Sequence, residues 1–299
     1  MPRSGDGGNV VAGTPLDELL ELLELEPLEV NLFRGVSPDE AQQRVFGGQV
    51  AAQALVAAGR TVDSDRPVNS LHAYFLRPGD PDVPIVYEVD RIRDGRTFTT
   101  RRVVAIQHGH AIFNLSASFQ VVEAGPDHQM EMPDVPGPEA LPTFRERLEP
   151  YLDRFGPETV DLLTRERPIE SRAVADPHWL EPTPRAPAQD VWIRANGVLP
   201  DDPLLHACVV AYASDLTLLD TATLPHAIGH SGQYQMASLD HAMWFHRPFR
   251  ADEWLLYHQV SPSASRARGL ALGHVFCRDG TLAVTVMQEG LIRPVPPRT

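Results

Sequence analysis

The stretch HACVVAYASDLTLLDTATLPH, residues 206–226, decides the interpretation of the fold, because it places one carboxylate inside a long apolar run. If the run forms a helix, the side chains three and four positions from Asp215 share its face. Those side chains are Ala211, Tyr212, Leu218 and Leu219. None of the four is charged, so the sequence predicts apolar surroundings for Asp215, where an ionised group is costly unless it is compensated.

An apolar helix followed by strands is predicted twice along the chain. In the first half, FGGQVAAQALVAAG (residues 46–59) predicts a helix of small residues, followed by strand-like runs at residues 69–78 and 84–122. In the second half, residues 204–219 predict the corresponding helix. Its strand-like runs are residues 237–248, 254–261 and 267–292. Internal duplication explains this order economically, with a single domain of coincidental similarity as the alternative.

Turn signals support the duplication and divide the chain into segments. Asp-Gly pairs at residues 94–95 and 279–280 supply the short turns that join antiparallel strands. The sequence therefore predicts two α+β domains separated by a proline-rich segment. The expected segments are a flexible tail (1–14), an N-terminal domain (15–123), a connector (124–188) with one short helix near residues 143–155, and a C-terminal domain (189–299).

Charge and composition limit the partners that the chain could bind. The net charge of −14 argues against nucleic-acid binding, which needs a basic surface, but it leaves room for an anionic small ligand. Nothing approaches eighteen consecutive apolar residues, so no membrane span is expected. The polar N-terminus lacks the apolar core of a secretory signal, and PPRT at the C-terminus is not a peroxisomal address. We expect a cytoplasmic location.

The two cysteines give no sign of a disulfide framework or a metal site. Cys208 and Cys277 are far apart, and the chain has no CxxC spacing. We interpret both as reduced, largely buried thiols, and neither has an evident base that would make it a nucleophile. We expect no metal and no cofactor.

Several motifs, taken together and in order, resemble the acyl-CoA thioesterase II family. They are RVFGGQVAAQAL (44–55), LHAYFLRPGD (71–80), DGRTFTTRRVVAIQ (94–107), VWIRANG (191–197), YASDL (212–216), LDHAMWFHRPF (239–249) and TVMQEGLIR (285–293). The likeness runs from about residue 15 to 295. It implies a double hotdog fold, in which an antiparallel sheet in each half wraps around one central helix. It also implies hydrolysis of acyl-CoA to a fatty acid and CoA, and assembly into dimers or tetramers.

The resemblance assigns the catalytic residues by motif to Asp215, Ser238 and Gln288. Many relatives have Thr where this chain has Ser238, and both residues offer one hydroxyl. A carboxylate can take the proton of an attacking water, and apolar neighbours would raise the pKa of Asp215 and make it a stronger base. The alternatives are ordinary structural roles, namely a helix N-cap for Asp215, a sheet hydroxyl for Ser238 and a polar strand-end residue for Gln288.

Three further residues are candidates for contact with the thioester. Gly47 and Gly48 precede the first predicted helix, whose N-terminal N–H groups suit the oxyanion of a tetrahedral intermediate. The two glycines could instead serve only tight helix–sheet packing. His72 could contact substrate, or it could be a hydrogen-bonded histidine near the core.

An arginine cluster around one predicted hairpin is the candidate site for the CoA phosphates. It consists of Arg91, Arg93, Arg96, Arg101 and Arg102, and the pair Arg266 and Arg268 is a second candidate in the other half. Guanidinium groups bind phosphate through paired hydrogen bonds. Alternatively, these arginines are solvated and pair with the abundant carboxylates.

Two other functions remain as alternatives to hydrolysis. A hotdog protein can bind acyl-CoA without turnover, although such a binder has no need of a buried carboxylate. Some hotdog proteins hydrate enoyl-CoA with an Asp closely followed by a His. Here the next histidine after Asp215 is His226, beyond Pro225, and this spacing does not fit.

Overall fold

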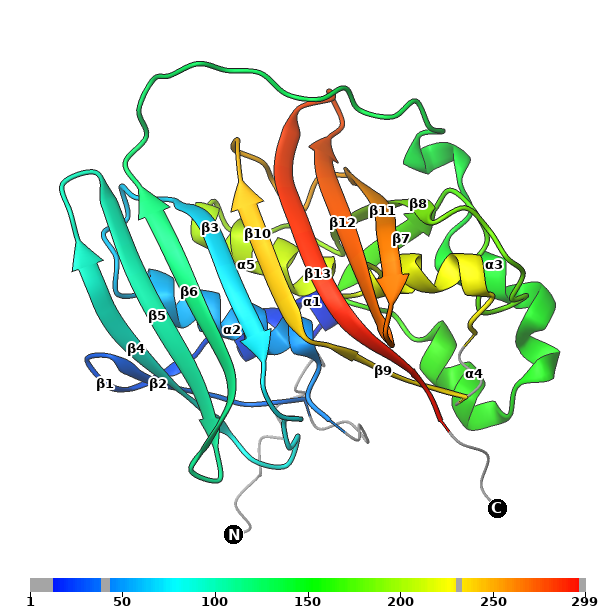
Figure 1. Cartoon of the computed structure of the whole chain (residues 1–299), viewed down its shortest axis with the longest axis horizontal. Coiled ribbons are helices and arrows are strands. Elements are labelled where there is room, and N and C mark those ends of the chain that lie inside the picture. The colour runs from blue at the N-terminus through cyan, green and yellow to red at the C-terminus, as the bar shows by residue number, and fades with distance from the viewer. Residues whose placement is uncertain (1–12, 39–43, 230–232, 296–299) are drawn as a thin grey trace, which may run out of the picture.

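The computed structural model describes residues 13–38, 44–229 and 233–295. Most of the tail expected at residues 1–14 lies outside these residues. Figure 1 shows an antiparallel sheet curved around two central helices. The first half contributes α1 (Pro15–Leu23), α2 (Gly47–Gly59), β1 (Glu26–Glu29), β2 (Leu32–Gly35), β3 (Val68–Phe75), β4 (Ile85–Asp94), β5 (Phe98–Gln107) and β6 (His110–Gln120).

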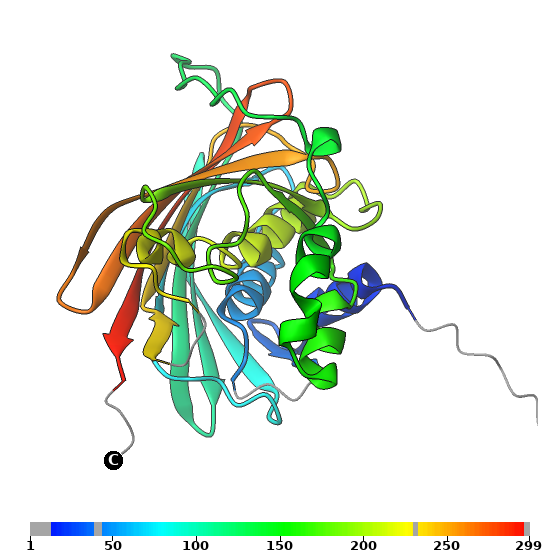
Figure 2. The same ribbon diagram turned by 90° about the vertical axis from the view of Figure 1, so that its right-hand side faces the viewer.

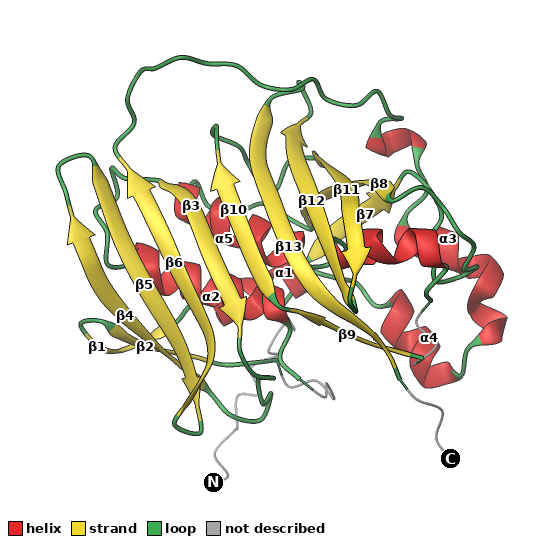
Figure 3. Cartoon of the chain, viewed as in Figure 1, coloured by secondary structure: helices red, strands yellow, loops and turns green. Residues whose placement is uncertain are grey.

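The second half repeats this plan after a helical connecting segment. The connecting segment contains the 3₁₀ helix η1 (Pro138–Ala140), α3 (Phe144–Leu148), the 3₁₀ helix η2 (Glu149–Arg154) and α4 (Pro157–Thr164). The second half contributes β7 (Ile169–Ala173), β8 (Ala188–Ala195), α5 (Pro203–Ser214), the 3₁₀ helix η3 (Leu219–His226), β9 (Tyr234–Ser238), β10 (Asp240–Phe245), β11 (Leu255–Ser265), β12 (Arg268–Cys277) and β13 (Leu282–Pro294). Figure 3 shows how the helices gather on one side of the strands.

The two halves have matching strand orders and join at the middle of the sheet. From outer edge to centre, the first half runs β1-β2-β4-β5-β6-β3, and the second runs β7-β8-β11-β12-β13-β10. Strands β3 and β10 pair antiparallel, with Leu71 opposite Met243, so the two predicted sheets form one 13-stranded sheet. This pairing leaves no unpaired edge between the halves. The predicted α+β double hotdog fold is confirmed, with the two sheets continuous.

Helices α2 and α5 pack antiparallel against each other inside the curve of the sheet (Figure 2). Residues 48–58 of α2 are all buried, as expected for a helix that is apolar all round. A Cβ atom at Gly48 would lie 2.5 Å from the Tyr212 carbonyl oxygen, and one at Gly59 would lie 2.4 Å from Leu204. Glycine at both ends of α2 therefore allows the two backbones to approach closely, and this brings the N-terminus of α2 to the C-terminus of α5.

The connecting segment is more structured than the single short helix that the sequence predicts. Residues 143–155 do form α3 and η2, and α3 begins with a capping box between Thr143 and Glu146. In addition, β7 pairs with β8 and extends the second sheet, within the segment expected to be a connector. Figure 2 shows α3 and α4 on the side of the central helices that faces away from the sheet. The central helices are therefore enclosed on both sides.

One helical stretch, Pro203–His226, has the length and mean hydropathy (1.2) of a membrane-crossing helix. Within the described residues, 67% of its 18-residue window is buried inside the protein. The stretch consists of α5 and η3, which form the core of the second half. Packing in this core accounts for its apolar character.

Candidate active site

Asp215 is the residue immediately after α5, where the chain turns toward η3. It is the C-cap of the helix, with φ −87° and ψ −3°, so the helix ends before the carboxylate and does not run through it. The alternative that Asp215 is an N-cap is therefore wrong. The C-terminus of a helix carries partial negative charge and disfavours an anion, whereas the nearby N-terminus of α2 favours one. The carboxylate thus lies between two helix ends of opposite polarity.

The three residues assigned by motif lie together around the Asp215 carboxylate. Gln288 Nε2 donates to Asp215 Oδ1 at 2.5 Å and to Ser238 Oγ at 3.0 Å. Ser238 Oγ donates to the same Asp215 oxygen at 3.1 Å. Strand β13 supplies Gln288, and β9, which pairs with β13, supplies Ser238 at its last position. A helix end and two neighbouring strands therefore converge on one carboxylate.

The surroundings of the carboxylate raise its pKa into the range of a useful base. Burial raises the pKa of Asp215 from 3.8 to about 6, although hydrogen bonds from Gln288, Ser238 and the Gly48 N–H oppose the shift. The desolvated ion is less stable than a solvated one, and the three donors recover only part of that loss. At neutral pH the group is still mostly ionised, so it can accept a proton.

The two glycines predicted near the thioester lie against the Asp215 carboxylate. A Cβ atom at Gly47 would lie 2.7 Å from Asp215 Oδ2 and 2.9 Å from the Phe75 ring. The Gly48 N–H donates to the carboxylate, and Gly48 also packs against the backbone of α5. Both expectations for the glycines therefore contain part of the answer, because Gly47 packs on Phe75 of the sheet and Gly48 packs on the backbone of α5.

His72 does not lie in this site. It lies on β3 between the buried residues Leu71 and Ala73, and its own side chain is exposed on the outer face of the sheet. Its ring packs edge-on against Trp244, with ring centroids 5.2 Å apart. Contact between His72 and a thioester bound at Asp215 is therefore excluded by the alternation of the strand.

The hairpin end of the predicted arginine cluster, with Arg93 and Arg96, lies at the opposite end of the strands from Asp215, whereas the other three arginines lie further along β4 and β5. The β4–β5 hairpin is level with Val68, because Val68 pairs with Phe119 and Phe98 pairs with Gln120. The candidate site is level with Phe75, seven residues along β3, or roughly 23 Å at the usual strand rise. The structure therefore does not bring the cluster to the site within one chain.

Three arginines of the cluster also have partners within the protein. Arg101 is only 1% exposed and donates to Thr61 Oγ1 at 2.8 Å and to Asp94 at 2.6 Å. Arg102 pairs with Asp90 at 3.0 Å, and Arg91 donates to an asparagine side chain at 2.9 Å. A contact between Arg101 and CoA is excluded by its burial. In the second candidate pair, Arg268 bonds to Glu289 at 2.9 Å.

Sequence reasoning missed a buried pair next to the carboxylate. His241 Nε2 lies 2.8 Å from Ser214 Oγ, and Ser214 Oγ donates to the Ala211 carbonyl oxygen at 2.9 Å. Desolvation lowers the pKa of His241 to about 4, so the ring is neutral at pH 7. With the serine hydrogen donated to the Ala211 carbonyl oxygen, the tautomer of His241 that completes the pair carries its hydrogen on Nε2. The pair connects β10 to the last turn of α5, directly before Asp215.

A cavity of about 790 Å³ opens in front of the carboxylate, and we call it the Asp215 cavity. Its walls include Phe46, Phe75, Phe113, Asp215 and Ser238. Two exposed arginines, Arg44 and Arg77, also line it, and sequence reasoning did not select them as CoA ligands. Both lie within the motifs that carry the family resemblance, but their place at a cavity becomes visible only in the fold.

Metal and thiol chemistry find no support in the described part of the chain. Among those residues, no group of three or more His, Cys, Asp or Glu side chains could hold a metal ion. Burial raises the pKa of the Cys208 and Cys277 thiols, which keeps both protonated. The polar chemistry at Asp215 therefore comes from carboxylate, hydroxyl, amide and backbone N–H groups.

Comparison with known proteins gives matches along most of the chain. The family model described as acyl-CoA thioesterase N-terminal domain matches residues 36–120, and the acyl-CoA thioesterase model matches residues 164–291. Acyl-coenzyme A thioesterase 8 of Mus musculus is 46% identical over 286 residues, covering 92% of this chain and 88% of the mouse protein. Acyl-CoA thioesterase 2 of Haemophilus influenzae is 41% identical, covering 93% and 98%.

Solved structures agree with these matches. The acyl-CoA thioesterase II TesB2 from Mycobacterium marinum has a TM-score of 0.76 and 45% sequence identity, and the match covers 94% of this chain and 99% of that protein. A hot dog fold protein from Alicyclobacillus acidocaldarius, at 19% identity and a TM-score of 0.75, supports the fold alone. With identities of 41–46% over more than nine tenths of its length, the chain belongs to the acyl-CoA thioesterase II family.

Proposed function

We propose that this chain hydrolyses fatty acyl-CoA to a free fatty acid and CoA, with Asp215 as the general base. The observation that supports this proposal most directly is that Asp215, Ser238 and Gln288 are all hydrogen-bonded to one another at the wall of a cavity. A binding protein has no need to hold a carboxylate with a pKa near 6 at this place. The family to which the chain belongs supports the same chemistry.

The hydrogen bonds leave defined positions for one attacking water. Asp215 Oδ1 already accepts from Gln288 and Ser238, so Oδ2 is the oxygen that takes the proton. Within the described residues, Gln288 Oε1 is buried and accepts no hydrogen bond from the protein. If a small shift of the Gln288 amide opens Oε1 to the cavity, this atom would accept the second hydrogen of the water and fix the orientation of its lone pair.

The steps of the reaction then follow from these positions. The water oxygen attacks the thioester carbon as Asp215 removes one proton, and a tetrahedral oxyanion forms. The N-terminus of α2 supports this negative charge, with the Gly47 N–H as the candidate donor. The carbon–sulfur bond breaks, the acid is released, and the CoA thiolate takes up the proton from Asp215. General base catalysis of this kind contributes about 10²- to 10⁴-fold to the rate.

The replacement Asp215→Asn tests the proposal. We expect kcat for thiol release from acyl-CoA to fall by about 10²- to 10⁴-fold, because the amide cannot accept the proton. Asp63→Asn, an exposed aspartate outside the site, is the matched control and should leave turnover unchanged. Turnover within a few-fold of wild type in Asp215→Asn would contradict the assigned role. Tight acyl-CoA binding without turnover in the wild type would favour a binding protein, and enoyl-CoA hydration would favour a hydratase.

Three expectations from the sequence stay predictions. They are assembly of the chain into dimers or tetramers, a cytoplasmic location, and domain boundaries at residues 15–123 and 189–299. Light scattering of the purified chain would determine the oligomeric state.

A further inference from the structure

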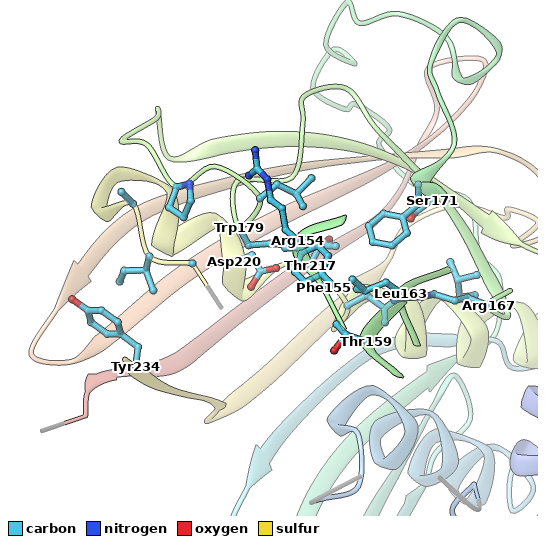
Figure 4. Close-up of a pocket in the computed structure, with 18 of the residues that line it drawn as sticks. Arg154, Phe155, Thr159, Leu163, Arg167, Ser171, Trp179, Thr217, Asp220 and Tyr234 are labelled. Atoms are coloured by element: carbon cyan, nitrogen blue, oxygen red, sulfur yellow. The ribbon is translucent and has the colours of Figure 1, made fainter. Parts of the chain in front are cut away.

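A second cavity lies directly beyond the site, under the helices of the connecting segment. It has a volume of about 960 Å³, and we call it the connector chamber. Its lining includes Phe144, Phe155, Thr159, Leu163 and Trp179 from the connecting segment, and Ile169 and Ile193 from β7 and β8. Figure 4 shows the labelled side chains of Phe155, Leu163 and Thr159 near Thr217. The chamber therefore has a largely apolar wall that two connecting helices provide.

The connector chamber and the Asp215 cavity share part of their walls. Asp220, Gly229 and Tyr234 line both cavities, and Leu216, next to the catalytic candidate, lines the chamber. The two cavities are therefore adjacent, and an acyl-CoA with its reactive carbon at Asp215 would reach both if it passes between them at these shared residues. The volume of each cavity lies within the range of about 300–1,000 Å³ that is typical of ligand sites.

The charges at the two cavities differ in a way that orients an acyl-CoA. Arg154 and Arg167 in the chamber already interact within the connecting segment, through Glu181 at 3.5 Å and the Phe144 ring at 5.0 Å. Among the described residues, Arg44 at the Asp215 cavity has no acidic partner, and Arg77 uses one nitrogen on the Ala111 carbonyl. Free guanidinium groups suit the phosphates of CoA, and the apolar chamber suits the hydrocarbon chain.

The chamber wall is fixed by buried contacts, so it can set a limit on length. Arg147 donates to the Ala173 carbonyl oxygen at 2.5 Å, and His178 lies 3.0 Å from Thr223 Oγ1 of η3. A Cβ atom at Gly229 would lie 2.8 Å from Pro182, so the segment after Trp179 packs closely on the second half. These contacts anchor the chain at Arg147 and at residues 178–182, and η2 and α4 lie along the chain between these two anchored points.

A third cavity, between α1 and α4, is the rival site for the hydrocarbon chain. Leu19, Leu22 and Leu162 line it, but so do Glu18, Glu21, Arg165 and Glu166. Of the residues described, only Phe46 is shared between its wall and that of the Asp215 cavity. The more charged wall and the smaller shared boundary make it a poorer site for an acyl chain.

We propose that the connector chamber holds the acyl chain, and that the connecting helices η2 and α4 set the chain-length preference. The inference rests on the proposed thioester hydrolysis at Asp215. It assigns a substrate-selecting role to residues 149–164, which lie between the two hotdog halves. Each methylene excluded from an apolar site lowers binding roughly fourfold, so a small change in depth gives a measurable change in preference.

The test is a substitution on the exposed wall of the connector chamber that fills part of its volume. Thr159→Trp places a large ring at the chamber, whereas Leu162→Trp, three residues along the same helix, faces the rival cavity. We expect Thr159→Trp to lower kcat/KM for palmitoyl-CoA about tenfold or more and to leave butyryl-CoA nearly unchanged, because two excluded methylenes suffice. In Leu162→Trp, the ratio of kcat/KM for palmitoyl-CoA to kcat/KM for butyryl-CoA should equal that of the wild type.

Each outcome separates this inference from the proposed function. Retained butyryl-CoA turnover in Thr159→Trp shows that the variant is folded and that the catalytic site works. An unchanged ratio in Thr159→Trp, or a loss of palmitoyl-CoA turnover in Leu162→Trp alone, would overturn the chamber assignment and leave hydrolysis standing. Absence of turnover by the wild type with either substrate would instead contradict the proposed function.

Discussion

At the scale of single residues, Asp215 combines two properties that normally conflict. It is desolvated enough for its pKa to rise to about 6, and it keeps three donors that favour the charged form. Ser238 and Gln288 come from strands that are paired with each other, so their geometry is set by the sheet. The Gly48 N–H comes from the other half of the chain, and it links the carboxylate to the duplication of the fold.

The raised pKa predicts a cost in stability that depends on pH. The folded state holds the Asp215 proton more tightly than the unfolded state, so the ionised form destabilises the fold. The cost is absent below pH 3.8 and complete above about pH 6, where it reaches about 3 kcal/mol.

We therefore expect Asp215→Asn to gain stability relative to wild type as pH rises. Urea unfolding at about pH 5 and about pH 8 measures the difference, which should be more favourable to the variant at the higher pH. Asp63→Asn serves again as the control, since Asp63 is exposed. A difference that is the same at both pH values would show that the pKa of Asp215 is not raised by the fold.

The catalytic candidates could be predicted from the sequence because each occupies a recognisable motif. Asp215, Ser238 and Gln288 meet as expected, although Asp215 ends its helix where the sequence suggested that the helix continues. The assignment of His72 to the site failed because strand alternation directs its side chain to the outer face. His241 on β10 is buried at a position of the strand that faces inward. No local signal in the sequence identified it as part of the site.

At the scale of elements, the last turn of α5 carries the site and is held from outside the helix. His241 shares a hydrogen bond with the Ser214 hydroxyl, and the Tyr257 hydroxyl donates to the Ser214 carbonyl oxygen at 3.1 Å. A Cβ atom at Gly273 would lie 2.2 Å from the Tyr257 ring, so glycine on β12 makes room for this contact. Strands β10 and β11 thus fix the residue that precedes Asp215.

We expect His241→Phe to reduce kcat several-fold while KM stays the same. The variant loses a hydrogen bond that positions the last turn of α5, worth about 0.5–1.5 kcal/mol. It also removes His241 Nδ1, which is buried without a partner among the described residues, so the free energy of unfolding should change little. His241→Gln, which can restore the donor, should recover part of kcat. Equal kcat in wild type and His241→Phe would refute a positioning role.

Element types were easier to predict than the structure of the connecting segment. The helices at 46–59 and 204–219 and the hairpins follow from apolar periodicity and turn residues. The dense prolines correctly indicated that the segment has no long elements, but they did not indicate β7. The partner of β7 is β8, which lies 15 or more positions further along the chain. Pairing over such a distance leaves no local pattern that a single sequence reveals.

At the scale of the whole molecule, the two halves have diverged at equivalent helix ends. Asp215 follows the C-terminus of α5. At the equivalent end of α2, the buried Arg101 instead donates hydrogen bonds to the side chain and the carbonyl oxygen of Thr61. A cation at a helix C-terminus is favourable, and Arg101 also pairs with Asp94. The first half therefore places a buried cation at this helix end, and the second half places the Asp215 carboxylate there.

The arginines at the Asp215 cavity predict how CoA is recognised in an acidic protein. We expect Arg44→Ala and Arg77→Ala each to raise KM for acyl-CoA about tenfold, because each removes a charge-assisted hydrogen bond. KM for an N-acetylcysteamine thioester, which lacks the phosphates, should not change. An increase of KM in Arg102→Ala, with no change in Arg44→Ala, would instead support the arginine cluster on β4 and β5 as the CoA site.

The failure of the arginine cluster as a site has a physical cause at this scale. The sequence shows which residues share a hairpin, but the distance of that hairpin from Asp215 depends on the register of β3, β5 and β6. Similarly, the joining of both sheets through β3 and β10 follows from pairing between halves. Both features arise between segments that are far apart in the chain.

The most direct test of the account is the pH dependence of kcat/KM for hydrolysis of an N-acetylcysteamine thioester. This substrate carries no titrating phosphate, so the profile reports groups of the free enzyme. We predict a rise of about tenfold per pH unit up to an inflection near 6, the pKa of Asp215, and a plateau above it. A profile with its inflection near 4, or with no inflection in this range, would contradict a desolvated Asp215 acting as the base.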